Sequence, residues 1–166
     1  MLVSIERGIN RLALFLALSA TAGLLLVALA TMVDVLLRWL FRAPIPGLGE
    51  ISALFTAVIV SACFPMLIAQ RGNVTIRFVG SVLGGRIARV LDAFGALVCA
   101  VFFSAMTWQY LRFSIEMTGA GESTPILRWP VGPWWWVVTL MITIAALIAY
   151  VVFVREARAQ LEKVES

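Results

Sequence analysis

Histidine is absent from the sequence, cysteine occurs only twice, and 13% of the residues are charged. Without histidine the chain lacks the commonest metal ligand and acid–base group, and it cannot form a bis-histidine haem site. Cys63 and Cys99 lie inside apolar runs, where we expect reduced, poorly reactive thiols rather than a disulfide. Phosphate loops, zinc motifs and a nucleophile with a base are also missing. We therefore predict a chain that is not an enzyme, with no catalytic residue, metal or cofactor.

Apolar residues dominate what remains: 62% of the 166 residues are hydrophobic. A soluble domain is closer to half apolar and a quarter charged, and a globule of this size could not bury so much apolar surface. This excludes a soluble enzyme, a nucleic-acid-binding domain and a disordered chain. The formal charge is +4, but the basic residues are scattered, so we expect membrane lipid and no nucleic acid as a partner.

Four long uncharged runs divide the chain. A helix needs about 20 apolar residues to cross the hydrocarbon layer, and none of the runs alternates as a membrane strand does. The runs predict an all-α membrane protein with one domain, residues 1–166, and transmembrane helices over about 12–33, 51–70, 93–111 and 133–154. Between the second and third spans, Ile76, Val79 and Leu83 favour a short amphipathic helix on the membrane surface.

Lysine and arginine predict the orientation, because they favour the cytoplasmic side. Nine of them lie in the two tails and in the loop between the second and third spans, and four lie on the opposite side. We therefore expect both termini in the cytoplasm and residues 42–50 and 113–130 outside. The six tryptophans fall at the predicted outer ends, where a membrane interface suits their rings.

Charged residues occur at the ends of the runs, not in their centres. Asp34 and Arg38 have the spacing of an ion pair on one helix, and they indicate either a self-neutralised pair or a gate or ion site. Glu50 either complements the start of the second helix or pairs with Arg38, Arg42 or a partner. Arg112 could pair with Glu116 one turn later.

Because no charge lies at mid-depth, an accessory membrane subunit fits better than a complete channel, pump or secondary transporter. Residues at the ends of the spans are then the candidates for contact with a partner. They are Asp34, Arg38, Arg42, Glu50, Arg71, Trp129, Trp134 and Trp135.

Three segments resemble the small, Q-type membrane subunit of the tripartite ATP-independent periplasmic (TRAP) transporters. They are Arg42-Ala43-Pro44-Ile45-Pro46-Gly47 leading to Glu50, then Gln70-Arg71-Gly72-Asn73-Val74-Thr75-Ile76, and Ser123-Thr124-Pro125-Ile126-Leu127-Arg128-Trp129-Pro130. The family often has a histidine and then an aspartate in the second segment. This chain has Asn73 and Val74 there, so no role of those polar groups is carried over.

The resemblance implies a function that composition cannot supply. In such systems a periplasmic binding protein captures an organic acid, and a large elevator-type subunit of the bacterial inner membrane imports it by sodium symport. The small subunit would extend the static part of the large subunit and help to receive the binding protein. Two alternatives remain open at this point: the membrane anchor of a respiratory complex without haem ligands, and a small homo-oligomeric exporter.

Overall fold

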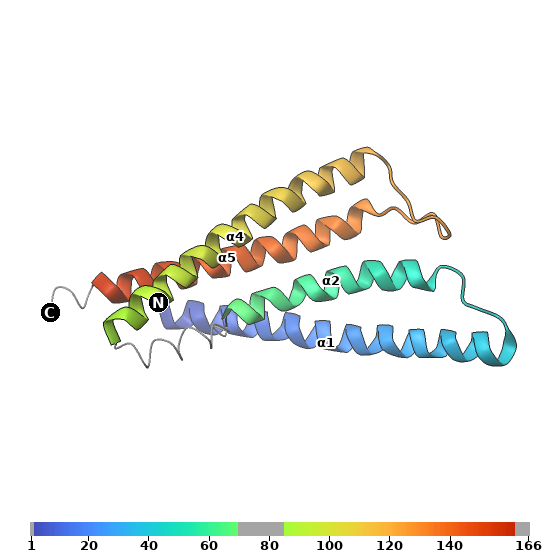
Figure 1. The fold of residues 1–166 in the computed structure, drawn as a ribbon, viewed down its shortest axis with the longest axis horizontal. Helices are drawn as coiled ribbons and strands as arrows, with labels where there is room; N and C mark the ends of the chain where they lie inside the picture. The colour runs from blue at the N-terminus through green and yellow to red at the C-terminus, as the bar shows by residue number, and fades with distance from the viewer. Residues whose placement is uncertain (1, 70–84, 162–166) are drawn as a thin grey trace.

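Four helices make up the described parts of the chain, residues 2–69 and 85–161 of a computed structural model. They are α1 (Leu2–Phe41), α2 (Leu48–Ala69), α4 (Gly85–Gly119) and α5 (Gly132–Leu161), labelled as in Figure 1. Within these residues strand-type pairing is limited to one isolated antiparallel bridge, between Ser123 and Pro130. All four helices are long and apolar enough to cross a membrane, which confirms the all-α prediction with four spans.

Each helix is longer than the uncharged run from which it was predicted. α1 continues through Asp34 and Arg38 to Phe41, because a charge ends an apolar run without interrupting the hydrogen bonds of a helix. The helix ends where Arg42 takes a left-handed conformation, with φ of 51°. The amphipathic helix expected around Ile76–Leu83 lies outside the described residues.

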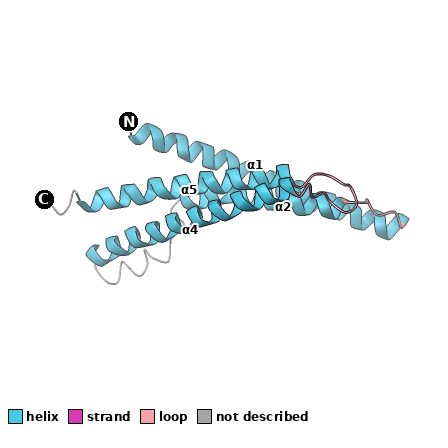
Figure 2. Ribbon diagram, turned by 90° about the horizontal axis from the view of Figure 1, so that it is seen from above, coloured by secondary structure: helices cyan, strands magenta, loops and turns pink. Residues whose placement is uncertain are grey.

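The helices form two hairpins that pack side by side. α4 packs on α5, α5 on α2, and α2 on α1. The start of α1 and the end of α5 lie at one end of the bundle, and the loops 42–47 and 120–131 lie at the other, which we call the loop end (Figure 1). Seen from above, α1 runs obliquely to the other helices (Figure 2). The cytoplasmic placement of both termini stays a prediction from the lysines and arginines.

The apolar core lies between α2, α4 and α5. Phe103, Val138, Ile142 and Ala145 are buried there, with Phe64 and Met106 packed against them. Small residues hold α1 against α2: Ala20 and Ala62 are buried beside Ile59, and an added Cβ at Gly23 would come within 3.1 Å of the Ile59 side chain. Small residues of this kind let two membrane helices approach closely.

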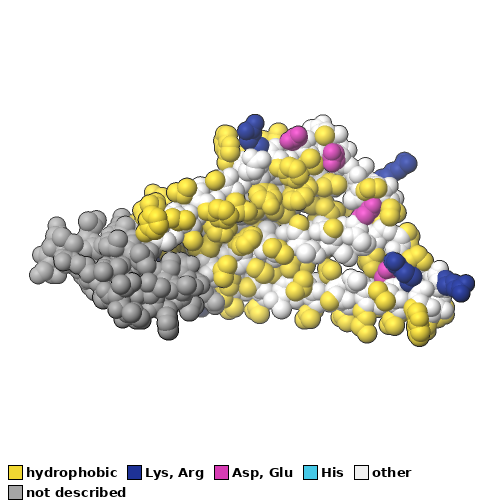
Figure 3. All heavy atoms as spheres, in the orientation of Figure 1, with side chains coloured by type: hydrophobic (Ala, Val, Ile, Leu, Met, Phe, Trp, Pro, Cys, Tyr) yellow, Lys and Arg dark blue, Asp and Glu magenta, His cyan; other side chains and the backbone are white. Residues whose placement is uncertain are grey.

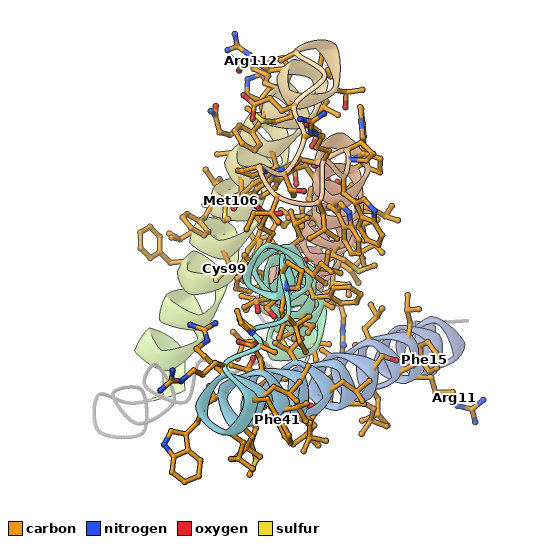
Figure 4. The ribbon with its side chains drawn as sticks, turned by 90° about the vertical axis from the view of Figure 1, so that its right-hand side faces the viewer. Arg11, Phe15, Phe41, Cys99, Met106 and Arg112 are labelled. Carbon is orange, nitrogen blue, oxygen red and sulfur yellow. The ribbon has the colours of Figure 1, made fainter. Side chains whose placement is uncertain are left out.

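Most of the surface of α1 is left without a protein neighbour. Phe15, Leu26 and Trp39 are 68%, 67% and 81% exposed. Figure 4, seen from the loop end, shows α1 crossing below the other three helices, with Phe15 towards one end and Phe41 at the other. The helix that opens the chain is therefore attached to the bundle along one stripe, through α2.

Candidate functional site

Charged side chains of the described residues lie towards both ends of the helices, with Arg11 and Arg155 on the side of the termini and Asp34, Arg38, Arg42, Glu50, Glu122 and Arg128 at the loop end. On the face shown in Figure 3 they lie near the ends of the helices and in the loops, while apolar side chains cover the middle of the bundle. Most of the residues that the sequence singled out as partner-interface candidates lie at the loop end. Arg71 is the exception, because it falls outside the described residues.

Asp34 is the buried carboxylate of the loop end, with 7% of its surface exposed. Its Oδ2 accepts a hydrogen bond from Arg38 Nη2 at 2.9 Å, and its Oδ1 accepts one from the Ile45 N–H at 2.7 Å. The first contact is the ion pair that the spacing on one helix allows. The second is long-range and fixes the loop 42–47 against the end of α1. With both oxygens engaged, the carboxylate acts as an anchor for the loop.

Glu50, in the first turn of α2, connects the two hairpins. Its Oε1 accepts the Ile126 N–H at 2.8 Å and its Oε2 accepts the Leu127 N–H at 3.2 Å. The sequence left open a charge at the start of the second helix or a pair with Arg38, Arg42 or a partner. Glu50 does lie in the first turn of α2, and among the described residues its carboxylate binds two peptide groups of the α4–α5 loop rather than an arginine. Hydrogen bonds from N–H groups to a carboxylate are among the stronger ones in proteins.

Gly47 and Leu127 form the apolar part of the same contact. Gly47 has φ of +80°, and a Cβ built on it would lie 1.4 Å from Leu127 Cδ1. Leu127 therefore occupies the space that any side chain at position 47 would need. Together with the Glu50 hydrogen bonds, this contact joins the loop 42–47 to the loop 120–131.

The loop 120–131 is closed by its own hydrogen bonds. The Thr124 N–H donates to the Trp129 carbonyl at 2.9 Å, and the Trp129 N–H donates to Thr124 Oγ1 at 3.0 Å. The Arg128 N–H donates to the Thr124 carbonyl at 2.9 Å, and the Val131 N–H donates to the Glu122 carbonyl at 3.0 Å. These hydrogen bonds join residues within the loop and fold it back on itself.

Tryptophans link this loop to the helices. Trp129 stacks on Trp134 with ring centroids 6.5 Å apart, and Trp134 meets Phe55 of α2 at 4.9 Å. Trp135 turns towards α4, where it contacts Tyr110 and Phe113. Trp134 and Trp135 are half-buried between helices, whereas Trp129 is 46% exposed.

A buried pair of hydroxyls lies between α4 and α5, and the sequence reasoning missed it. Ser114 Oγ and Thr139 Oγ1 are 2.8 Å apart, and Thr139 Oγ1 also donates to the Trp135 carbonyl at 2.8 Å. Serine and threonine are common in membrane helices, so only the packing reveals which hydroxyls meet. In the described parts of the chain no three metal-ligating side chains come together.

The side chains of two exposed arginines of the loop end, Arg42 and Arg128, make no hydrogen bond or ion pair with a described residue. Both are in the left-handed region, with φ of 51° and 55°. Arg112 and Glu116, which could have paired on α4, make no ion pair with each other. The site therefore consists of two loops joined by Glu50 and by the packing of Leu127 on Gly47, with Asp34 holding the first loop against α1 and two exposed arginines at the edge.

A family model for the DctQ component of tripartite ATP-independent periplasmic transporters matches residues 27–159. The match begins within α1 and extends into α5, so it includes the loops 42–47 and 120–131. No curated protein and no solved structure matches the chain.

Proposed function

The chain belongs to the family of DctQ components, the small membrane subunits of tripartite ATP-independent periplasmic (TRAP) transporters, and we propose that it is a scaffold beside a larger subunit. In this proposal the larger subunit carries an organic acid inward by an elevator motion driven by a sodium gradient. A periplasmic binding protein delivers the acid at the loop end. The complex lies in the bacterial inner membrane with both termini of this chain in the cytoplasm.

The proposed scaffold role rests mainly on one observation, the exposed apolar surface of α1. α1 contacts the rest of the bundle through one stripe, and its other faces present large apolar side chains such as Phe15 and Leu26. A helix exposed on so many sides can pack against the helices of a second membrane protein while α2 keeps it attached to its own. The large subunit and lipid would share this surface.

The uncharged centres of the spans support an accessory role over independent transport. No charged residue interrupts the runs Leu12–Val33, Ile51–Gln70, Ala93–Leu111 and Trp129–Val154. An organic anion loses its hydration on entering a membrane protein, and only fixed polar or charged groups can replace it. The transported anion would therefore bind in the larger subunit.

The interface candidates at the loop end take two kinds of role in this proposal. Asp34 and Glu50 act indirectly, because their carboxylates already hold the two loops. Arg42 and Trp129 are exposed and available to a partner. Trp134 and Trp135 support these surfaces from between the helices, the exposed Arg38 pairs with Asp34, and Arg71 would contact a neighbour at the opposite end.

Uptake by the reconstituted transporter tests the proposal. The ligand that co-purifies with the binding protein would be identified, radiolabelled and offered to proteoliposomes that hold a sodium gradient and the large subunit, with or without this chain. We expect uptake only when this chain is present. Full uptake by the large subunit without it, or uptake by this chain alone, would contradict the proposal.

A charge reversal supplies the matched variants. Glu50→Lys removes the acceptor of the Ile126 and Leu127 N–H groups, so we expect weaker assembly or uptake. Glu122→Lys reverses an exposed charge of the α4–α5 loop whose side chain makes no hydrogen bond or ion pair with a described residue, so we expect nearly normal uptake. Equal effects of the two reversals would show that the Glu50 contact does not matter for function.

A further inference from the structure

The side of α4 that faces away from α5 carries a polar stripe, formed by Gln109, Arg112 and Glu116. Their spacing of i, i+3 and i+7 places them on one face of the helix, and all three are exposed. None of their side chains makes a hydrogen bond or ion pair with a described residue. Phe103 and Ser114 mark the opposite face of α4, which is buried against α5. Figure 4 shows Arg112 on the side of the bundle opposite α1, so the polar stripe points away from the protein's own helices.

Contacts with α5 show where the polar stripe lies along the membrane. The rings of Phe113 and Trp135 meet with centroids 4.8 Å apart, and Trp136 Nε1 donates to Thr118 Oγ1 at 3.0 Å. The stripe is therefore level with the first turns of α5, inside the span Phe94–Gly119 and near its outer end. Polar side chains within membrane spans usually face other protein rather than lipid. Three of them on the outer side of α4 indicate a protein neighbour there.

An apolar seam continues the polar stripe along the same side of α4. Its members are exposed and, with Arg112 added, follow one another in steps of four and three residues. This is the spacing at which two parallel helices pack along a common seam. Alanine lies in the middle of the seam, and a small residue at that place lets two membrane helices approach closely. The apolar seam consists of Phe94, Val98, Val101, Ala105 and Trp108.

The charges of the polar stripe are complementary to a second copy of the same stripe. Arg112 precedes Glu116 by one turn, and a basic residue before an acidic one is the weaker order for a pair within a helix. The two side chains indeed make no ion pair with each other. A two-fold axis along the membrane normal would set two copies of α4 side by side and parallel. Each Arg112 would then be about 6 Å along the axis from Glu116 of the other copy, within reach of its long side chain.

Other occupants fit the polar stripe less well. An anionic lipid headgroup would be attracted to Arg112 but repelled by Glu116 one turn away, and hydrocarbon chains cannot bond to the Gln109 amide. The larger subunit has its proposed surface on α1, and α1 and α4 lie on opposite sides of the bundle, because α4 packs on α5, α5 on α2 and α2 on α1 (Figure 1). A second copy supplies an acid for the arginine and a base for the glutamate at once.

We propose that the polar stripe and the apolar seam of α4 pair two copies of this chain about a two-fold axis. The apolar seam makes the main contact, and reciprocal Arg112–Glu116 ion pairs set the register of the two helices. Each copy keeps its α1 for a larger subunit, so the complex holds two copies of each chain. The scaffold role does not use this side of α4, and either proposal can fail without the other.

Thiol cross-linking in native membranes tests the contact between the two copies. In a background of Cys63→Ala and Cys99→Ala, the variant Ala105→Cys places one thiol in the apolar seam, and Leu140→Cys places one on the exposed surface of α5 as the control. A short bifunctional reagent should give a covalent dimer at least about tenfold faster from Ala105→Cys, because pairing holds the two thiols at a high effective concentration. Equal rates at the two positions, or no dimer from Ala105→Cys, would overturn the proposal.

Charge swaps test the ion pairs, with energy transfer between labelled copies in liposomes as the measure of dimerisation. Arg112→Glu gives the polar stripe two acids and Glu116→Arg gives it two bases, so each should weaken the dimer by about tenfold. Arg112→Glu combined with Glu116→Arg restores one of each and should return dimerisation to within about twofold of wild type. Arg128→Glu is the control for an exposed cation outside α4 and should leave the dimer unchanged.

Rescue by the double swap requires a partner that carries the same swap, and only a second copy does. Single reversals that leave the dimer at wild-type strength, or a double swap as weak as the single ones, would overturn the ion pairs. Glu116→Arg that retains more anionic lipid without changing dimerisation would show that lipid occupies the stripe. A purified complex with one copy of each subunit and normal uptake would overturn the dimer and leave the scaffold role intact. A dimer of this chain without a larger subunit would overturn the scaffold role alone.

Discussion

Replacing Gly47 with alanine tests the contact that joins the two hairpins. The new Cβ would be placed 1.4 Å from Leu127 Cδ1 and 2.9 Å from Leu127 Cγ, so the leucine must leave its position. The alanine would also keep a left-handed φ of +80°, which destabilises the folded state by about 1–2 kcal/mol. Displacing a packed side chain adds about 1–3 kcal/mol. We therefore expect a total loss of about 2–5 kcal/mol.

Gly121→Ala is the matched control. Gly121 is also left-handed, with φ of +64°, but a Cβ there meets nothing within 4 Å. Its loss should be the conformational part alone, about 1–2 kcal/mol. Both variants would be unfolded in mixed micelles of increasing denaturing detergent, and intrinsic fluorescence would report the loop end through the stacked Trp129 and Trp134. An equal loss of stability in the two variants would refute the packing of Leu127 over Gly47.

Three further predictions concern the described contacts. Asp34→Ala should lower the free energy of unfolding by about 1–3 kcal/mol, because it removes an acceptor of two hydrogen bonds. Arg38→Ala should lower it by less than about 1 kcal/mol, because that side chain is 66% exposed; the reverse order would contradict the anchoring of the loop by Asp34. Ser114→Ala and Thr139→Val should each be destabilising, and the double variant should lose less than the sum, a difference that a double-mutant cycle measures. Cys63, which is free and exposed on the apolar surface of α2, should react poorly with a membrane-impermeant maleimide in intact cells, and rapid labelling by that reagent would argue against its position in a span.

The number and type of the helices were predictable because the physics involved is local. Runs of about 20 uncharged apolar residues without alternation form helices in a membrane, and Pro133 falls in the first turn of α5, a position that proline favours. The helix ends were less predictable. α1 passes through Asp34 and Arg38, since a pair at this spacing stabilises a helix even where the apolar run has ended.

The candidate site was predictable only in part, for a different reason. The Asp34–Arg38 pair follows from spacing alone. The partners of Glu50 do not, because they are backbone N–H groups 76 and 77 residues away, and every residue except proline carries such a group. The packing of Leu127 against Gly47 depends in the same way on how the two hairpins meet. Long-range contacts of this kind leave no pattern in one sequence.

Affinity purification of this chain from its native membrane tests the central claim most directly. The tagged chain would be extracted in a mild detergent, and the proteins that remain bound after size-exclusion chromatography would be identified by mass spectrometry. The scaffold role predicts a larger multi-pass membrane protein in a fixed ratio to this chain. Recovery of this chain alone, or as an oligomer of itself, would contradict it.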